Sequence, residues 1–287
     1  MPTVRTAERT LTAFLDGEDS PDISNPIHST KVAAEYGFRG ALVGGVTVYG
    51  WMAPAILELL GEPWLADGWA DISFRRPVYP GDALTVRVTG GESEAELTLL
   101  NSDGERCIAG RVGLGRAPFA DSLARPGRVG AEARPGSLPW LTLETAPAGE
   151  DLPPMAVALP LDAAEAYATN LQRDEAPRWH GEQALAHPGW IAARMTPLIK
   201  HSYDYGPAIH ARSEIQHLAP ARAGQTFTIA GRFVSAYEEK GHHYAVVDGL
   251  VLAEDGGAVA QIRHTVIFQV AKRPAREAQH GSPTAAR

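Results

Sequence analysis

Two pairs of aspartate and histidine with the same spacing are the clearest candidates for proton transfer in this sequence. Asp22 stands six residues before His28, and Asp204 stands six residues before His210. A neutral imidazole is a competent general base near pH 7, and a carboxylate beside it can orient or share a water molecule. Because His210 directly precedes a predicted strand, we expect a packing or surface role for it.

Other common catalytic patterns are absent from the sequence. It has no Gly-x-Ser-x-Gly motif for a nucleophilic serine, and no Gly-x-Gly-x-x-Gly or Walker loop for a nucleotide. The single cysteine, Cys107, has no Cys or His neighbours at zinc-binding spacing. We therefore expect neither a metal nor a cofactor.

Composition excludes several classes of partner. The chain has 287 residues, of which 44% are apolar and 21% are charged, and its net charge is −8. These values are typical of a globular protein of about two domains, and without a basic run we expect no nucleic-acid or anionic-membrane partner. No apolar window is long enough for a membrane span, and Arg5, Glu8 and Arg9 interrupt any signal-peptide core. The expected location is cytoplasmic.

An internal repeat organises the elements that must position these residues. The segments 77–86 and 220–229 share Pro, Gly and Thr at an offset of 143 residues, and the same offset carries Met52 and Pro54 to Met195 and Pro197. Pro and Gly form a turn in each segment, and an alternating apolar stretch follows, as in a strand entering an antiparallel sheet. Two copies of one unit explain both matches.

Each copy reads as a buried helix followed by an antiparallel sheet. The segment 47–60 is mostly apolar on all sides, as in a helix covered by a sheet, and Gly61 ends it. The predicted strands are 71–74, 84–88, 94–100 and 106–114 in the first copy, and 212–217, 227–237, 243–253 and 258–270 in the second. This pattern defines an α+β unit.

The repeat also divides the chain. We expect a first repeat over 1–116, a proline-rich linker over 117–160, a second repeat over 161–275 and a disordered tail over 276–287. The linker is long enough to cross the molecule, so the two sheets can meet side by side.

One motif resembles a known family. Asn25-Pro26-Ile27-His28, followed by Ala-Ala-Glu-Tyr-Gly-Phe-Arg-Gly over 33–40 and a glycine-led helix, resembles the MaoC-like, or hydratase-2, branch of the hotdog superfamily. The resemblance extends over most of the chain except the linker and tail. It implies a tandem (double) hotdog, in which two central helices are each wrapped by an antiparallel sheet.

The resemblance further implies a hydratase or dehydratase acting on an enoyl or 3-hydroxyacyl thioester of coenzyme A or a carrier protein. In such enzymes an Asp and a His hold the water, and backbone N–H groups at the start of the central helix polarise the thioester carbonyl. His28 matches the family histidine and Asn25 the asparagine before it. Gly44, Gly45 and Val46 lie where that helix begins.

The sequence departs from the family pattern at two places. Ile23 occupies the position of the family acid, and Asp22 lies one residue further from His28. The His-Gly at the helix start is replaced by Val43-Gly44-Gly45. A one-residue bulge would bring Asp22 into line, and without one the pair of catalytic groups is broken.

Two further candidate residues, Tyr49 and His187, each have two interpretations. Tyr49 lies either in the core or along an acyl pocket on the first helix. His187 either caps the second helix or reaches a cleft shared by the two copies. The offset places Leu171 opposite His28, so the sequence predicts at most one site of this type.

Three functions are compatible with this reading. The first is the hydratase or dehydratase, with His28 as base and acid, Asp22 as its carboxylate partner and Asn25 as a hydrogen-bonding support. The second keeps the fold and acyl pocket for a thioesterase, isomerase or cyclase. The third is a non-catalytic acyl-binding subunit. A monomer of two fused repeats and a homodimer both fit.

Overall fold

Ten antiparallel strands form one continuous sheet. The computed structural model describes residues 4–15, 17, 19 and 24–272. The sheet order is β1-β3-β4-β5-β2-β7-β10-β9-β8-β6. The strands are β1 (Arg5–Thr12), β2 (Gly68–Phe74), β3 (Ala83–Gly90), β4 (Glu94–Asn101), β5 (Arg106–Leu114), β6 (Asp151–Leu159), β7 (Ile209–His217), β8 (Gln225–Glu239), β9 (His242–Leu252) and β10 (Ala258–Gln269).

The two halves of the chain meet edge to edge in the middle of this sheet. Strands β1 to β5 come from the first half and β6 to β10 from the second, and β2 pairs with β7 through Ala70 opposite Ile215. This pairing joins two sheets that would each have a free edge there. The predicted tandem of two α+β units, placed side by side, is confirmed.

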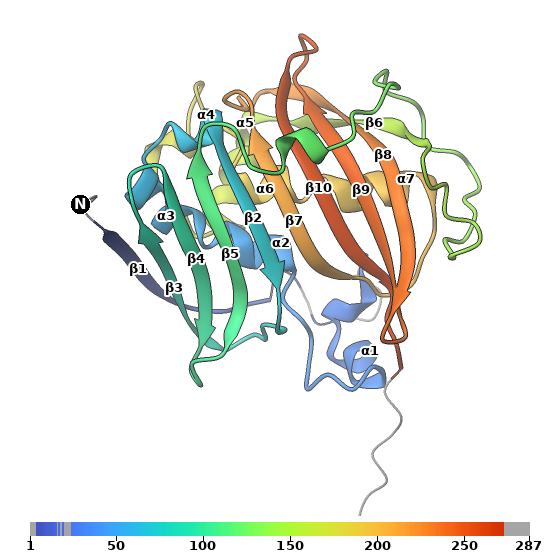
Figure 1. Ribbon diagram of the computed structural model, residues 1–287, viewed down its shortest axis with the longest axis horizontal. Coiled ribbons are helices and arrows are strands. Elements are labelled where there is room, and N and C mark those ends of the chain that lie inside the picture. Colours follow the sequence, from blue (N-terminus) through green and yellow to red (C-terminus); the bar gives the residue numbers. More distant parts are fainter. Residues whose placement is uncertain (1–3, 16, 18, 20–23, 273–287) are drawn as a thin grey trace, which may run out of the picture.

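Most of the helices lie behind one face of the sheet, and the short helix of the linker lies in front of the other face, as Figure 1 shows. The helices are η1 (Pro26–His28), α1 (Thr30–Glu35), α2 (Gly45–Gly50), α3 (Ala53–Leu60), α4 (Trp64–Asp67), η2 (Ala120–Ser122), α5 (Leu161–Ala166), η3 (Tyr167–Leu171), η4 (Pro177–Trp179), α6 (Pro188–Ala192) and α7 (Met195–Ser202). The central pairs, α2 with α3 and α6 with α7, stand at corresponding places in the two halves.

The predicted helix over 47–60 is two helices in the structure. Helix α2 ends at Gly50 and α3 begins at Ala53. Pro54 lacks an N–H group and cannot bond to the carbonyl of Gly50, so a continuous helix is interrupted there. Pro197 lies at the matching offset in α7, and the second half has the same break. Gly61 ends α3 with φ of 78°, as predicted.

The predicted linker over 117–160 contains a strand. Strand β6 pairs with β8 at the outer edge of the sheet, so the second sheet begins at Asp151. Pro153 and Pro154 suggested irregular structure, but an edge strand tolerates proline, and the register shifts between Leu152 and Met155. Strand β1 was also not predicted, and the predicted tail, 276–287, lies outside the described residues.

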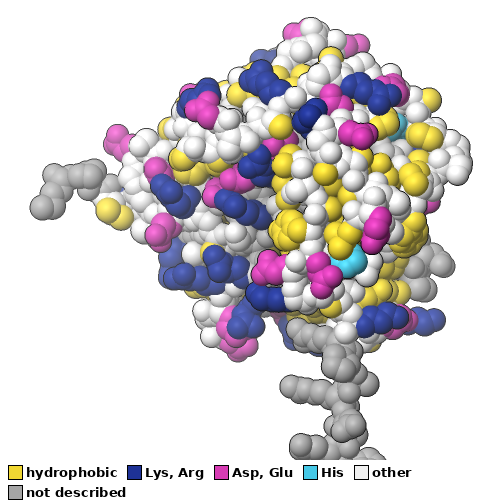
Figure 2. All heavy atoms as spheres, turned by 45° about the vertical axis from the view of Figure 1, so that its right-hand side comes forward, with side chains coloured by type: hydrophobic (Ala, Val, Ile, Leu, Met, Phe, Trp, Pro, Cys, Tyr) yellow, Lys and Arg dark blue, Asp and Glu magenta, His cyan; other side chains and the backbone are white. Residues whose placement is uncertain are grey.

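The first part of the linker, 117–124, crosses the outer face of the sheet. The Ala117 N–H donates to the side chain of Gln216 on β7, and the Ala124 N–H donates to Asp248 on β9. Figure 2 shows acidic and basic side chains interspersed over the face that it presents. None of the helices within the described ranges is both long and apolar enough to cross a bilayer.

Two glycines let α7 approach the sheet closely. Gly231 on β8 and Gly249 on β9 are cross-strand neighbours, and a Cβ atom at either would collide with a side chain of α7. At Gly249 the obstructing side chain is Met195, and at Gly231 it is Leu198. The distance between α7 and the sheet therefore depends on both glycines.

The close approach of α7 predicts the effect of one methyl group. Gly249→Ala is expected to lower the free energy of unfolding by about 1–3 kcal/mol, because Met195 or the strand must shift. Gly136→Ala is the control, since a Cβ atom there meets nothing within 4 Å, and its effect is expected to stay within about 0.5 kcal/mol. Denaturant unfolding measures both, and equal effects would contradict the close packing of α7.

Candidate functional site

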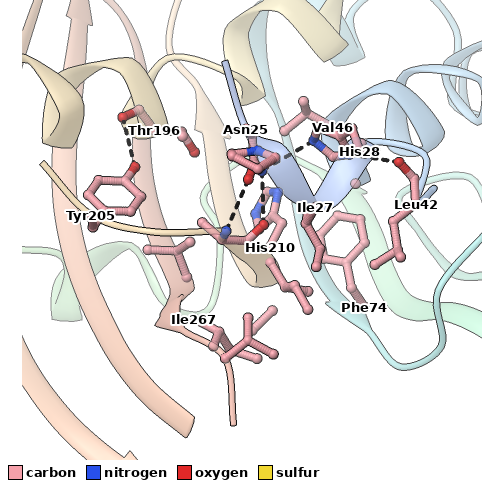
Figure 3. Close-up of a pocket in the computed structure, with 18 of the residues that line it drawn as sticks. Asn25, Ile27, His28, Leu42, Val46, Phe74, Thr196, Tyr205, His210 and Ile267 are labelled. Carbon is pink, nitrogen blue, oxygen red and sulfur yellow. Dashed lines mark hydrogen bonds between the residues drawn. The ribbon is translucent and has the colours of Figure 1, made fainter. Parts of the chain in front are cut away.

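A cavity of about 1330 Å³ lies where the two halves meet. The first half contributes η1, the start of α2 and the end of β2, and the second contributes α7, the start of β7 and the end of β10. Figure 3 shows side chains from both halves converging there. Much of the wall is apolar, including Phe38, Val46, Phe74, Val266 and Ile267. Such a mixture of apolar wall and a few polar groups suits a small organic ligand.

His28 lines this cavity from the end of η1. Its Nδ1 atom lies 2.7 Å from the carbonyl oxygen of Leu42, and its Nε2 atom lies 3.2 Å from Nδ2 of Asn25. Burial lowers the pKa of His28, and the charge of Lys200 lowers it too, while the bond to Leu42 opposes them. The imidazole is therefore neutral at pH 7.

Asn25 determines which nitrogen of His28 carries the proton. Its Oδ1 accepts the backbone N–H of Ala208 at 3.0 Å, and its Nδ2 donates to the carbonyl of Ala208 at 2.9 Å. This two-bond contact fixes the orientation of the amide, so Nδ2 also faces His28 as a donor. The Nε2 atom of His28 must then be the acceptor, and the proton is on Nδ1, where it is donated to Leu42.

Gly44, the residue before α2, lies beside His28, and Gly45 lies between Phe74 and His210. A Cβ atom at Gly44 would lie 3.7 Å from Cε1 and 3.8 Å from Nε2 of His28. Gly44 has no side chain to cap the helix, and the first N–H groups of a helix have no acceptor within it. Gly44, Gly45 and Val46 all line the cavity. An acceptor atom placed at these N–H groups would therefore lie close to the His28 ring.

His210 lies in the wall of the cavity. The expected surface role is therefore wrong, and the expected packing role agrees with its ring contacts. The pairing of β7 with β10 shifts register opposite Ala211, so His210 turns to the same side as Ser213, and its Nε2 lies 2.8 Å from Ser213 Oγ. Its ring packs 4.3 Å from Phe74 and from His264, measured between centroids. Burial lowers the pKa of His210 well below its ordinary value. No sequence signal marks this bulge.

His187 and Tyr49 lie away from the cavity lining. His187 is the N-cap of α6, where its Nδ1 accepts the N–H of Gly189 at 3.1 Å, and its Nε2 lies 3.7 Å from Asp174. The capping interpretation therefore fits His187, and its place in a shared cleft is not seen. Tyr49 is fully buried in the core, where burial raises its pKa. Asp22 lies outside the described residues.

The second half has no histidine at the position that corresponds to His28. Leu171, which corresponds to His28, is the last residue of η3, and its carbonyl accepts the indole N–H of Trp51 at 3.0 Å. Across the described ranges, no group of three His, Cys, Asp or Glu side chains is placed to bind a metal ion.

Solved structures share this fold at low sequence identity. A MaoC-like dehydratase is 15% identical with a TM-score of 0.61, over 92% of this chain and 98% of that one. A protein from Chloroflexus aurantiacus described as a MaoC domain protein dehydratase is 15% identical with a TM-score of 0.61, over 94% and 96%. A conserved protein from Mycobacterium tuberculosis with a double hotdog fold is 17% identical with a TM-score of 0.63, over 93% and 96%.

These likenesses define the fold of this chain as a double hotdog. The tandem hotdog that the Asn25–His28 motif implied is confirmed. Two of the three neighbours carry the MaoC name that the motif suggested. No protein-family model matches the sequence, and no curated protein matches it. At these identities the comparison concerns architecture, and the reaction must be argued from the site.

The contacts of His28 predict how it titrates. In the unaltered chain we expect its pKa to lie below 6.5, and Asn25→Asp should raise it, because a carboxylate oxygen at Nε2 stabilises the imidazolium. An NMR titration of the imidazole C–H signals measures both values, with His28→Gln identifying the signal. An unchanged or lower pKa in Asn25→Asp would show that Asn25 does not face Nε2.

Proposed function

We propose that this chain is a hydratase or dehydratase that acts on an enoyl or 3-hydroxyacyl thioester, carried by coenzyme A or a carrier protein. One observation carries the proposal: a neutral imidazole, with its proton fixed on Nδ1, lies beside uncapped N–H groups in a partly apolar cavity. The proposal includes a cytoplasmic location and either a monomer or a homodimer.

The carbonyl oxygen of the thioester would accept hydrogen bonds from the N–H groups of Gly45 and Val46. These bonds strengthen as negative charge develops on that oxygen when a nucleophile adds at C3. Glycine at 44 leaves the approach open. Phe74 and Val46 supply apolar surface for the acyl chain.

His28 would move the proton. In hydration, a water molecule replaces the Asn25 amide as the donor to Nε2, its oxygen bonds to C3, and its proton passes to Nε2. The resulting imidazolium returns that proton to C2 of the enolate, which completes the addition of water. Dehydration follows the same steps in reverse. Asp22 is proposed as the carboxylate that holds the water.

Thioester hydrolysis is the second candidate. The same geometry favours it, because a water held by His28 near an oxygen bound at Gly45 could also attack the carbonyl carbon. The two reactions differ in whether the carbon–sulfur bond breaks.

Loss of the enoyl-thioester absorbance on incubation with crotonoyl-coenzyme A tests the proposal. We expect turnover, and a fall of about 10²- to 10⁴-fold in kcat for His28→Ala, because the general base is removed. His180→Ala is the matched control, since His180 lies outside the cavity lining beside Glu165, and it should keep the full rate.

Other outcomes separate the alternatives. Release of free thiol, measured with a thiol reagent, would indicate hydrolysis, and a product of unchanged mass would indicate an isomerase or cyclase. A ligand-induced rise in Tm without any product would indicate an acyl-binding subunit. Turnover that His28→Ala leaves unchanged would contradict the role of His28.

A further inference from the structure

The charged side chains that line the cavity are almost all basic. Its lining includes Arg75, Arg76, Arg134, Lys200, Lys240 and Lys272, and its one acidic residue among the described residues is Asp204. The chain as a whole has the opposite balance, with a net charge of −8, and charges of both signs are interspersed over the face in Figure 2. A concave site with one sign of charge attracts ligands of the other sign.

Lys200 differs from the other basic residues of this lining in its position. It extends from α7 into the cavity, where its Nζ donates to the carbonyl of Ser24 and lies 5.4 Å from the ring centroid of Tyr205. The side chain is half-buried, and this burial lowers the pKa of Lys200. A partly desolvated ammonium group is costly without a counter-charge.

Lys200 has no carboxylate within 4.0 Å among the residues that the structure describes. The more distant charge of Asp204 raises the pKa of Lys200 against the effect of burial but makes no direct contact with it. Of the other basic side chains in the lining, Arg76 pairs with Glu105 at 3.0 Å and Lys240 pairs with Glu239 at 3.2 Å. Arg75 also has no carboxylate within 4.0 Å among the described residues, but its side chain is not bonded beside Asn25 as Lys200 is. An ammonium group has three N–H donors, and the carbonyl of Ser24 uses one of them. The remaining donors are available to an anionic group in the cavity.

Lys200 lies near His28, whose pKa its charge lowers. Ser24, which accepts its hydrogen bond, is the residue before Asn25, and Asn25 contacts Nε2 of His28. The phosphates of coenzyme A or of a carrier protein are separated from the thioester by the long pantetheine arm. An anion at Lys200, near the thioester end of the ligand, therefore belongs to the acyl group.

We propose that Lys200 binds a carboxylate on the acyl group, so that the preferred ligand is a monothioester of a dicarboxylic acid. The inference rests on the proposed function, which supplies the thioester, and it adds a carboxylate at the other end of the same acyl group. A charge-assisted hydrogen bond of this kind changes affinity by about 10- to 100-fold.

Binding of two saturated thioesters tests this proposal without requiring turnover. Succinyl- and butyryl-N-acetylcysteamine differ in a carboxylate against a methyl group, and neither carries a phosphate. We expect calorimetry to give about 10- to 100-fold tighter binding of the succinyl compound. Lys200→Met should abolish this preference, and Lys200→Arg should retain much of it. Lys31→Met, an exposed lysine outside the cavity lining, should leave it unchanged.

Three results would overturn the proposal. These are equal binding of both compounds to the unaltered chain, a preference that survives in Lys200→Met, and a Lys200→Met effect confined to coenzyme A thioesters, which would assign Lys200 to carrier phosphates.

The enoyl pair, fumaroyl- and crotonoyl-N-acetylcysteamine, separates this proposal from the proposed function. A carboxylate preference in binding without hydration of either compound would support the role of Lys200 and contradict the hydratase. Hydration with equal kcat/KM for both compounds would support the hydratase and contradict the role of Lys200.

Discussion

The arrangement of the site depends on the contact between the Asn25 side chain and the backbone of Ala208. A partly buried amide and a buried peptide group must each satisfy a donor and an acceptor, and here they satisfy one another. The contact sets the direction of the amide, and the amide then sets the tautomer of His28. Because Asn25 belongs to the first half and Ala208 precedes β7, the same contact holds the motif loop against the second half.

Much of the architecture could be predicted from the sequence, because period and turn chemistry are local properties. Strands form where apolar residues alternate after a turn that contains Pro and Gly. Examples are β3 after Gly81 and β8 after Gly224. The edge strand β6 could not be recognised, since Pro153 and Pro154 are tolerated there only because of its position in the sheet. Such a position is a property of the whole fold.

Some residues of the candidate site could be predicted from the sequence, and others could not. His28, Asn25 and the glycines at the start of α2 were found because they lie within one continuous motif and its following helix. His210 reaches the cavity through a bulge at Ala211, and Lys200 reaches it because α7 of the second half lies against the motif loop of the first, where Lys200 bonds to Ser24. Both depend on contacts between distant segments, and no spacing in the sequence reveals them.

The starts of the two central helices have opposite chemistry. His187 occupies the N-cap of α6 with its own ring and bonds the N–H of Gly189, whereas Gly44 leaves the corresponding place at α2 unfilled. The two copies of the unit therefore differ at this point: the start of α6 is capped by a side chain, and the start of α2 is not. Because the N–H of Gly189 is already bonded to His187, of these two helix starts only that of α2 offers unbonded N–H groups to a ligand in the cavity.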